Sequence, residues 1–324
     1  MLKPFRPAEP GVSRAREVTG NQRTTMFENV VVGVDRHEGG QDAIALAVRL
    51  ASGSAKLTLA YVIHGNDSAW RGAVPPIEPA ERLQAELELH ATASEAAVQA
   101  DVRCYGNASI GKGLHELCEL VGADLLVVGS SRRSVVGRIL FGNDTRASLN
   151  GAPCAIAIAP AGFAHDPIPI ARIGVAYNES PESEHALAVA RDLAAEHNAK
   201  LLALEAVSIP AYALGSGLVP MPLDEWTQSL LGRARDRLSS LDGVQAHAVC
   251  GPAPEALVSF SSSVDLLVVG SRGYGPFGRV VYGSTSQRLA RSVGCPLLVL
   301  TRGARAATTG AAKDRSGAAV SAGA

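Results

Sequence analysis

The chain has 324 residues, of which 47% are hydrophobic and 19% are charged. This composition is typical of a globular protein and excludes a disordered or collagen-like chain. The formal net charge is −1 and the sequence contains no block of like charges, so we expect neither a nucleic-acid partner nor binding to an anionic membrane surface.

The two ends of the chain differ from its interior. Residues 1–26 and 303–324 lack apolar periodicity, and we expect a disordered N-terminal extension and a disordered C-terminal tail. The sequence has no apolar run of about 18 residues or more and no apolar segment behind the first basic residues, which favours a cytoplasmic protein. The five cysteines lack C-x-x-C and zinc-type spacing, so we expect buried, reduced thiols and no metal site.

After residue 26, short apolar runs alternate with longer helical patterns. The runs predict strands at 30–34, 56–63, 102–105, 125–129 and 154–159, and the longer patterns predict helices at 41–51, 80–100, 114–121 and 145–150. The strand runs are rich in Val, Ile and Leu without alternation, as in strands that are covered on both faces. The regular succession of strands and helices predicts an α/β fold with a parallel, doubly wound sheet.

The second part of the chain repeats the first. The heptapeptide Asp124–Ser130 recurs unchanged as Asp265–Ser271, and the residues around it keep nearly the same spacing. A duplication follows, with two domains of the same fold. We expect domains at 27–161 and 170–302, joined by a linker at 162–169.

The loops behind the first and fourth strands of each repeat are the expected ligand sites, because open α/β sheets bind ligands beyond the carboxyl ends of their strands. In the second repeat Ser180-Pro181 predicts a helix start directly after the first strand. The fourth strand runs into a glycine-rich loop that contains Gly270, Gly273, Gly283 and Ser284. Glycines allow close backbone approach to a phosphate, although the same residues also build tight turns without a ligand.

The spacing Gly270-x2-Gly273-x9-Gly283-Ser284 resembles the ATP-binding motif of the universal stress protein family, G-x2-G-x9-G-[S/T]. The strand end at Asp35 and the segments around Cys154 and Cys295 also have counterparts in that family. The resemblance implies two tandem Rossmann-like domains of the adenine nucleotide alpha hydrolase type, each with a five-stranded parallel sheet flanked by helices. It also implies an intramolecular pseudo-dimer with the two final strands, 154–159 and 297–300, at the contact.

Site residues follow from the same resemblance. In the second domain it implies nucleotide contacts from Gly270, Gly273, Gly283, Ser284, Asn178, Val269 and Ala206. In the first domain it implies contacts from Asp35, Val62, Val128, Gly129 and Gly142. The first domain departs from the motif at Arg132 and Asn143, and the second departs at Asn178, where the family has Asp. We therefore expect a nearly complete site in the second domain and an eroded one in the first.

These features predict an ATP-binding protein, with or without Mg²⁺, that acts as a nucleotide-responsive regulator in stress response. Two alternatives stay open: a nucleotide-independent scaffold with eroded sites, and a slow ATP hydrolase. No catalytic residue is assigned, because His37, His64, His115 and His185 are scattered and are expected to be solvated surface side chains. Homodimerisation and the identity of regulatory protein partners stay open as well.

Overall fold

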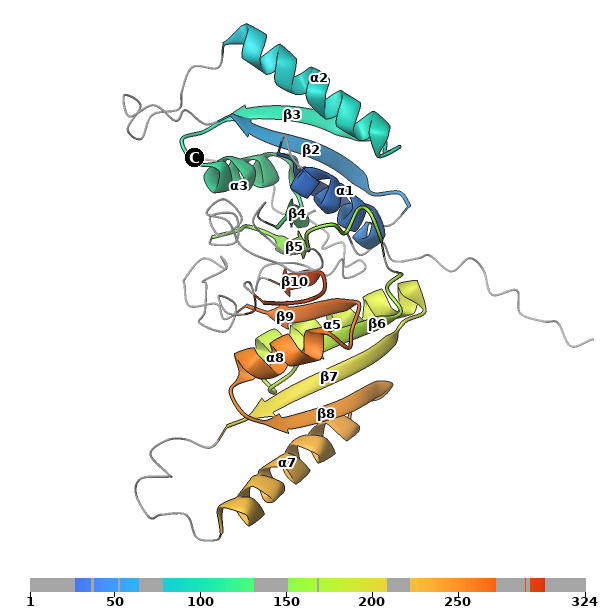
Figure 1. Cartoon of the computed structure of the whole chain (residues 1–324), viewed down its shortest axis with the longest axis vertical. Coiled ribbons are helices and arrows are strands. Elements are labelled where there is room, and N and C mark those ends of the chain that lie inside the picture. Colours follow the sequence, from blue (N-terminus) through green and yellow to red (C-terminus); the bar gives the residue numbers. More distant parts are fainter. Residues whose placement is uncertain are drawn as a thin grey trace, which may run out of the picture.

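The computed structural model describes residues 27–35, 38–51, 53–63, 78–130, 151–167, 169–208, 222–271, 289 and 292–300. The first half of the chain contains β1 (Asn29–Gly33), α1 (Glu38–Leu50), β2 (Lys56–Ile63), α2 (Pro79–Glu95), β3 (Asp101–Gly106), α3 (Ile110–Val121), β4 (Leu125–Gly129) and β5 (Ala155–Ala159). The second half contains β6 (Arg172–Ala176), α5 (Pro181–His197), β7 (Lys200–Val207), α7 (Leu223–Ser239), β8 (Val244–Cys250), α8 (Ala253–Ser261), β9 (Leu266–Gly270) and β10 (Leu297–Leu300). Figure 1 shows these two halves stacked along the long axis of the molecule.

Most predicted elements agree with the structure to within a few residues, and two helix boundaries differ. Helix α2 ends at Glu95 rather than at Ala100, because Ala97 takes a left-handed conformation with φ of 52°. Helix α3 begins at Ile110, directly after the extended Ser109, and not at Leu114. The predicted helix 145–150 lies outside the described residues.

The strands form one ten-stranded sheet in the order β3-β2-β1-β4-β5-β10-β9-β6-β7-β8. Within each half the strands are parallel, and the two halves meet where β5 and β10 pair in antiparallel orientation. The pairs at this junction are Leu297 with Ile158, Leu298 with Ala157, and Val299 with Ile156. The final strands therefore lie side by side, as the family resemblance implies, and they join the two five-stranded sheets into one.

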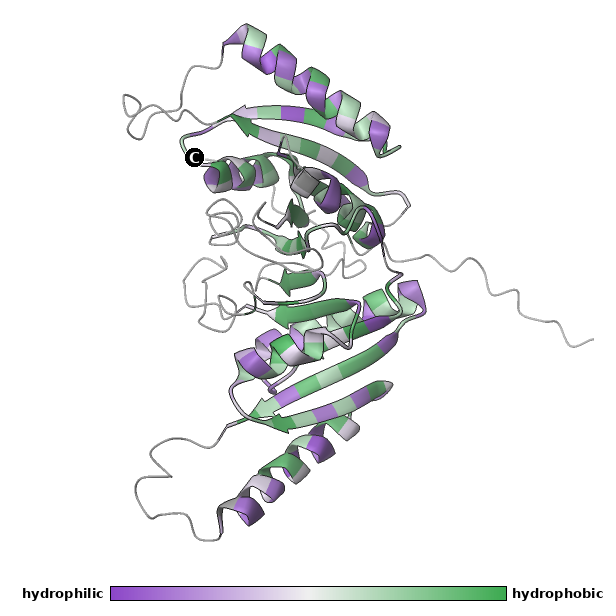
Figure 2. Ribbon diagram, in the orientation of Figure 1, coloured by the Kyte–Doolittle hydropathy of each residue, from purple (hydrophilic) through white to green (hydrophobic). Residues whose placement is uncertain are grey.

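Apolar side chains cover both faces of this sheet. On one face α1, α2, α5 and α7 pack on a core that runs through both halves, and on the other face α3 and α8 pack on a second core. The four strands nearest the junction, β4, β5, β9 and β10, carry no polar side chain, whereas hydrophilic residues interrupt the outer strand β8 (Figure 2). The expectation of buried thiols is wrong for Cys250, because this residue ends the outer strand β8 and its side chain is exposed.

The repeated heptapeptide has a structural role at its first residue. The carboxylate of Asp124 accepts hydrogen bonds from the backbone N–H groups of Glu28 and Asn29, at 2.7 and 3.2 Å. Asp265 accepts the equivalent bonds from Ala171 and Arg172, at 3.1 and 2.8 Å. In each half this aspartate ties the start of the fourth strand to the start of the first.

Candidate functional site

The strand order places one topological switch point in each half. Strand β1 lies between β2 and β4, and strand β6 lies between β7 and β9. Helices leave such a strand and its neighbour toward opposite faces of the sheet, so the carboxyl ends of the two strands border a crevice. The residues that follow β1, β4, β6 and β9 are therefore the candidate site residues.

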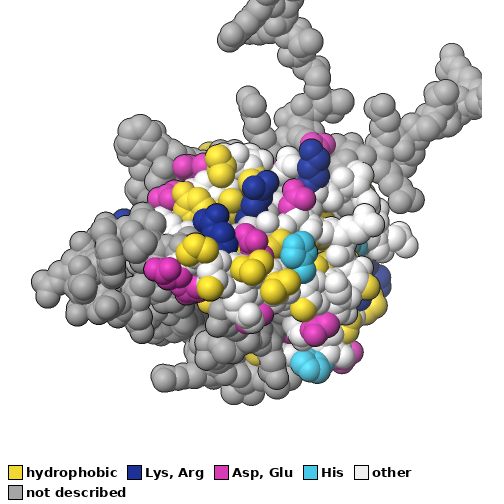
Figure 3. Space-filling model, turned by 90° about the horizontal axis from the view of Figure 1, so that it is seen from above, with side chains coloured by type: hydrophobic (Ala, Val, Ile, Leu, Met, Phe, Trp, Pro, Cys, Tyr) yellow, Lys and Arg dark blue, Asp and Glu magenta, His cyan; other side chains and the backbone are white. Residues whose placement is uncertain are grey.

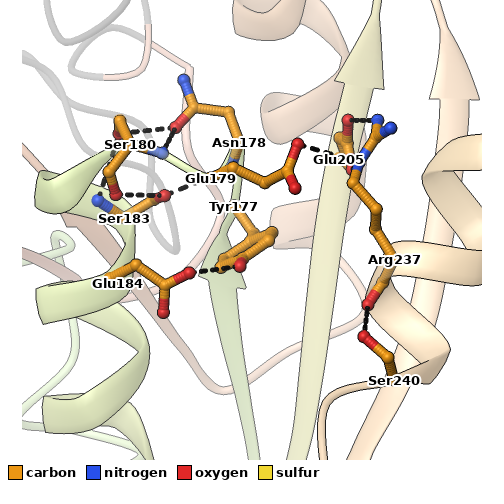
Figure 4. Close-up of polar contacts among 9 residues, drawn as sticks. All are labelled: Tyr177, Asn178, Glu179, Ser180, Ser183, Glu184, Glu205, Arg237 and Ser240. Carbon is orange, nitrogen blue, oxygen red and sulfur yellow. Dashed lines mark hydrogen bonds and ion pairs between the residues drawn. The ribbon is translucent and has the colours of Figure 1, made fainter.

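In the second half, the turn between β6 and α5 is held by a closed set of hydrogen bonds (Figure 4). The side-chain oxygen of Asn178 accepts from the backbone N–H and the hydroxyl of Ser180, at 3.3 and 2.6 Å. The Ser180 hydroxyl oxygen accepts from the backbone N–H of Ser183 at 3.3 Å, which confirms the predicted cap of this helix. The Ser183 hydroxyl donates to the Ser180 carbonyl at 2.9 Å and accepts from the backbone N–H of Asn178 at 3.3 Å.

Glu179 connects the same turn to helix α7. Its backbone is in the left-handed region with φ of 59°, which is strained for a residue with a Cβ. Its carboxylate forms an ion pair with Arg237 at 3.1 Å, and the Arg237 guanidinium also contacts both carboxylate oxygens of Glu205 (Figure 4). Because Glu205 is buried in β7, Arg237 compensates its charge and fixes the turn at the same time.

This ionic cluster was missed by sequence reasoning. Glu205 follows the apolar run Leu201–Leu204 inside β7, which was the available signal, but its partner lies 32 residues away. In the first half the corresponding positions hold Tyr61, which is partly buried and packs against the apolar core, and Ala93, which belongs to that core. The polar cluster therefore belongs to the second half alone among the described residues.

Tyr177 lies beneath this turn. Its hydroxyl donates a short hydrogen bond to the carboxylate of Glu184. Burial, the hydrogen bond to Glu184 and the nearby carboxylates raise the pKa of Tyr177 to about 12. The turn therefore rests on a tyrosine that stays protonated well above neutral pH.

The structure brings several of the expected second-half residues to one edge. Asn178 follows β6, and Gly270 ends the neighbouring strand β9. Ala206 lies near the end of β7. Val269 is buried and packs in the core on the α8 side. Gly273, Gly283 and Ser284 lie outside the described residues.

Gly270 has a packing role. A Cβ atom at this position would lie 2.5 Å from the backbone carbonyl oxygen of Glu182, in the first turn of α5. Only glycine allows the helix start to approach the end of β9 so closely. In the first half, a Cβ atom at Gly129 would lie 2.0 Å from the backbone carbonyl oxygen of Gly39.

The first half positions Asp35, Val62, Val128 and Gly129 at the equivalent edge. Asp35 is exposed two residues after the end of β1, and its carboxylate oxygens lie 3.8 and 4.0 Å from the Cβ position of Gly39. Val62 and Val128 are buried and pack beneath α3. Gly142, together with the departing residues Arg132 and Asn143, lies outside the described residues.

Ser130 and Ser271 are additional candidates that sequence reasoning did not single out. Each directly follows the glycine that ends the fourth strand, and each has a buried hydroxyl oxygen with no hydrogen-bond partner among the described residues. Buried hydroxyls normally have a partner, so these two at equivalent positions mark a place in each half where a polar group would fit. Their recurrence in both repeats was the available signal.

The described residues hold no group of three or more His, Cys, Asp or Glu side chains that could bind a metal. His115 and His185 are partly exposed, and the Nε2 atom of His185 is shielded from solvent, so the expectation of a fully solvated side chain is wrong for His185. His37 and His64 lie outside the described residues.

The face of the molecule at the α2 end carries both charged and hydrophobic side chains (Figure 3). Basic, acidic and hydrophobic side chains are interspersed on it, and Leu83 and Leu87 of α2 are both exposed. Within the described residues that this view shows, neither sign of charge dominates. No helix in the described part of the chain has the length and hydropathy needed to cross a membrane.

Two parallel five-stranded units of the same strand order, with helices on both faces, define a duplicated Rossmann-like α/β protein. The family model described as "Universal stress protein family" matches residues 26–160 and 169–301. The chain belongs to the universal stress protein family.

Individual relatives agree with this assignment. A universal stress protein of Mycobacterium tuberculosis is 30% identical over 184 residues, which cover 55% of this chain and 61% of that protein, less than two thirds of its length. A universal stress protein of Mycolicibacterium smegmatis is 28% identical over 295 residues, which cover 84% of this chain and 96% of the relative. The crystal structure of a universal stress protein from Archaeoglobus fulgidus covers 85% of this chain and 98% of its own, with a TM-score of 0.58 and 16% sequence identity.

Proposed function

We propose that this universal stress protein binds ATP and acts as a nucleotide-responsive regulator in stress response, with its better site in the second half. The observation that carries the proposal is the meeting of Asn178 and Gly270 at the switch point, where the glycine-rich motif begins. The buried hydroxyl of Ser271 at the same strand end has no hydrogen-bond partner among the described residues, and it supports the proposal because a bound ligand could supply one.

The charges of the second half favour different positions for the phosphates and for the nucleoside of a bound nucleotide. Glu179, Glu182 and Glu184 surround the turn after β6, so this turn disfavours phosphate groups. The phosphates belong on the glycine-rich loop behind Gly270, and the base or ribose belongs beside Asn178. Mg²⁺ would accompany the phosphates and would not occupy a separate protein site.

Calorimetric titration of the purified chain with ATP tests the proposal directly. Gly273→Val and Gly283→Val place a branched side chain on the predicted phosphate path, and each should weaken ATP binding by about tenfold or more, because a phosphate held by main-chain N–H groups needs close approach. Gly232→Ala is the matched control, since a Cβ there would contact no atom within 4 Å. Undiminished ATP binding by both valine variants would contradict the site.

Mass spectrometry of the small molecules released on denaturing the protein tests the regulatory part. Co-purified ATP is expected for a protein that is loaded in the cell. A regulator should also change its hydrogen exchange or its association state when ATP is added. Binding without any such change would reduce the function to nucleotide storage.

A further inference from the structure

The direction of every hydrogen bond in the turn after β6 is determined. The backbone N–H of Ser180 can only donate, so the side-chain atom of Asn178 that it contacts at 3.3 Å must be the oxygen. The Ser180 hydroxyl donates to the same oxygen and accepts from the N–H of Ser183. The amide orientation of Asn178 therefore follows from chemistry and is not a free choice.

The remaining polar atom of this side chain is the amide nitrogen. Figure 4 shows it directed away from Ser180 and Ser183, and no described residue accepts a hydrogen bond from it. An amide nitrogen carries two N–H donors and cannot accept. Asn178 therefore offers a ligand a donor and nothing else.

The first half offers the opposite group at the equivalent place. Asp35 and Asn178 are each the second residue after their strand, β1 and β6 respectively. An ionised aspartate only accepts hydrogen bonds. The first half also lacks the supporting serine, because Gly40 occupies the position of Ser183 as the third residue of its helix.

We infer that the second half holds its nucleoside through an acceptor atom, a ring nitrogen or an oxygen of the base or ribose, which receives a hydrogen bond from Asn178. An amino group of the base is not the partner of this residue, whereas it suits Asp35 in the first half. The two halves thus present opposite hydrogen-bonding groups at equivalent positions. This inference rests on the proposed nucleotide binding.

The decisive variant is Asn178→Asp in the full chain. An aspartate keeps the acceptor for Ser180 and so preserves the turn, but it replaces the outward N–H donors by a second acceptor. Affinity for adenosine should fall by about tenfold or more, because a polar ligand atom then faces a group that cannot pair with it. Adenosine is the informative probe, since it is uncharged and the added carboxylate cannot repel it as it would repel ATP. Asn178→Ala should weaken adenosine binding less than the aspartate does.

Asp35→Asn is the matched control, because it makes the reverse change in the first half. Unchanged or tighter adenosine binding by Asn178→Asp, with the parent binding normally, overturns the inference and leaves nucleotide binding intact. A parent chain that binds neither adenosine nor ATP overturns the proposed function itself. Loss of binding in Asp35→Asn without any effect of Asn178→Ala would assign the nucleotide to the first half and overturn both assignments to the second.

Discussion

Substitution of Arg237 by methionine tests whether the ionic cluster of the second half is needed for folding. The Glu205 side chain is 9% exposed and the Arg237 side chain 33% exposed, so the guanidinium reaches water while the carboxylate does not. Removing one partner of a buried pair costs about 3–5 kcal/mol of unfolding free energy, because the remaining charge is left uncompensated. Partial solvent access at Arg237 places the expected loss near the lower limit, at about 3 kcal/mol.

The first half of the same molecule supplies the control for this prediction. Its equivalent positions carry no charge: Tyr61 packs against the apolar core and Ala93 is part of it. The double variant Glu205→Leu with Arg237→Met should therefore return to within about 1 kcal/mol of the parent, as apolar replacements of buried ion pairs often do. Glu179→Gln, which removes only the more exposed ion pair, should cost less than about 1 kcal/mol.

Urea unfolding followed by circular dichroism measures all four proteins, with equal m-values as the condition for comparing them. With the single variant Glu205→Leu added, the double-mutant cycle is complete and isolates the coupling between Glu205 and Arg237. A loss below about 1 kcal/mol for Arg237→Met, where about 3 is expected from a buried pair, would refute the view that Glu205 depends on this arginine. A double variant as unstable as the single one would refute it equally.

Three further outcomes are expected. Gly270→Ala should lower the unfolding free energy by about 2 kcal/mol or more, because its Cβ would meet backbone, whereas Gly232→Ala should raise it by about 0.5–1 kcal/mol; thermal melts that do not separate the two would contradict the packing role of Gly270. Tyr177, with its pKa raised to about 12 chiefly by burial, contributes stability below its ordinary pKa of 10.0 that is lost as pH rises toward 12. In an alkaline absorbance titration of the tyrosines, Tyr177→Phe should lack the ionisation step at the highest pH. If the parent-minus-variant difference curve is centred at the ordinary tyrosine pKa of 10.0, the prediction is wrong. Burial lowers the pKa of His197 below its ordinary 6.5, so stability falls as pH drops below that value and the unfolded chain takes up the proton first; unfolding of His197→Gln should be less acid-sensitive, and equal pH slopes would contradict this.

The fold could be predicted largely from the sequence because its signals are local and repeated. Continuous apolar runs specify buried strands such as β4 and β5, and the recurring heptapeptide specifies a second copy of the same unit. The early end of α2 could not be predicted, since alanines continue beyond Glu95 and nothing in the sequence marks Ala97 as left-handed.

The candidate site was predictable only in outline. The motif indicates the strand ends at Gly129 and Gly270, but a sequence does not reveal that the missing side chains make room for Gly39 and Glu182. The bond between Asn178 and Ser180 is a short-range turn pattern, yet the outward direction of the amide nitrogen depends on the whole set of bonds around Ser183. The partner of Glu205 depends on how α7 packs on β7, which is a tertiary property.

The antiparallel pairing of β5 with β10 has a consequence for how the protein responds to dilution. A single repeat would leave one of these strands as an open edge that needs a second molecule to cover it, and its stability would then depend on concentration. Here the covering strand is part of the same polypeptide, so its effective concentration is constant at any abundance of the protein. In a homodimer every substitution occurs in both subunits, whereas the two repeats of one chain can change independently. Asn178 can differ from Asp35, and Glu205 from Tyr61, without any symmetric copy of the change.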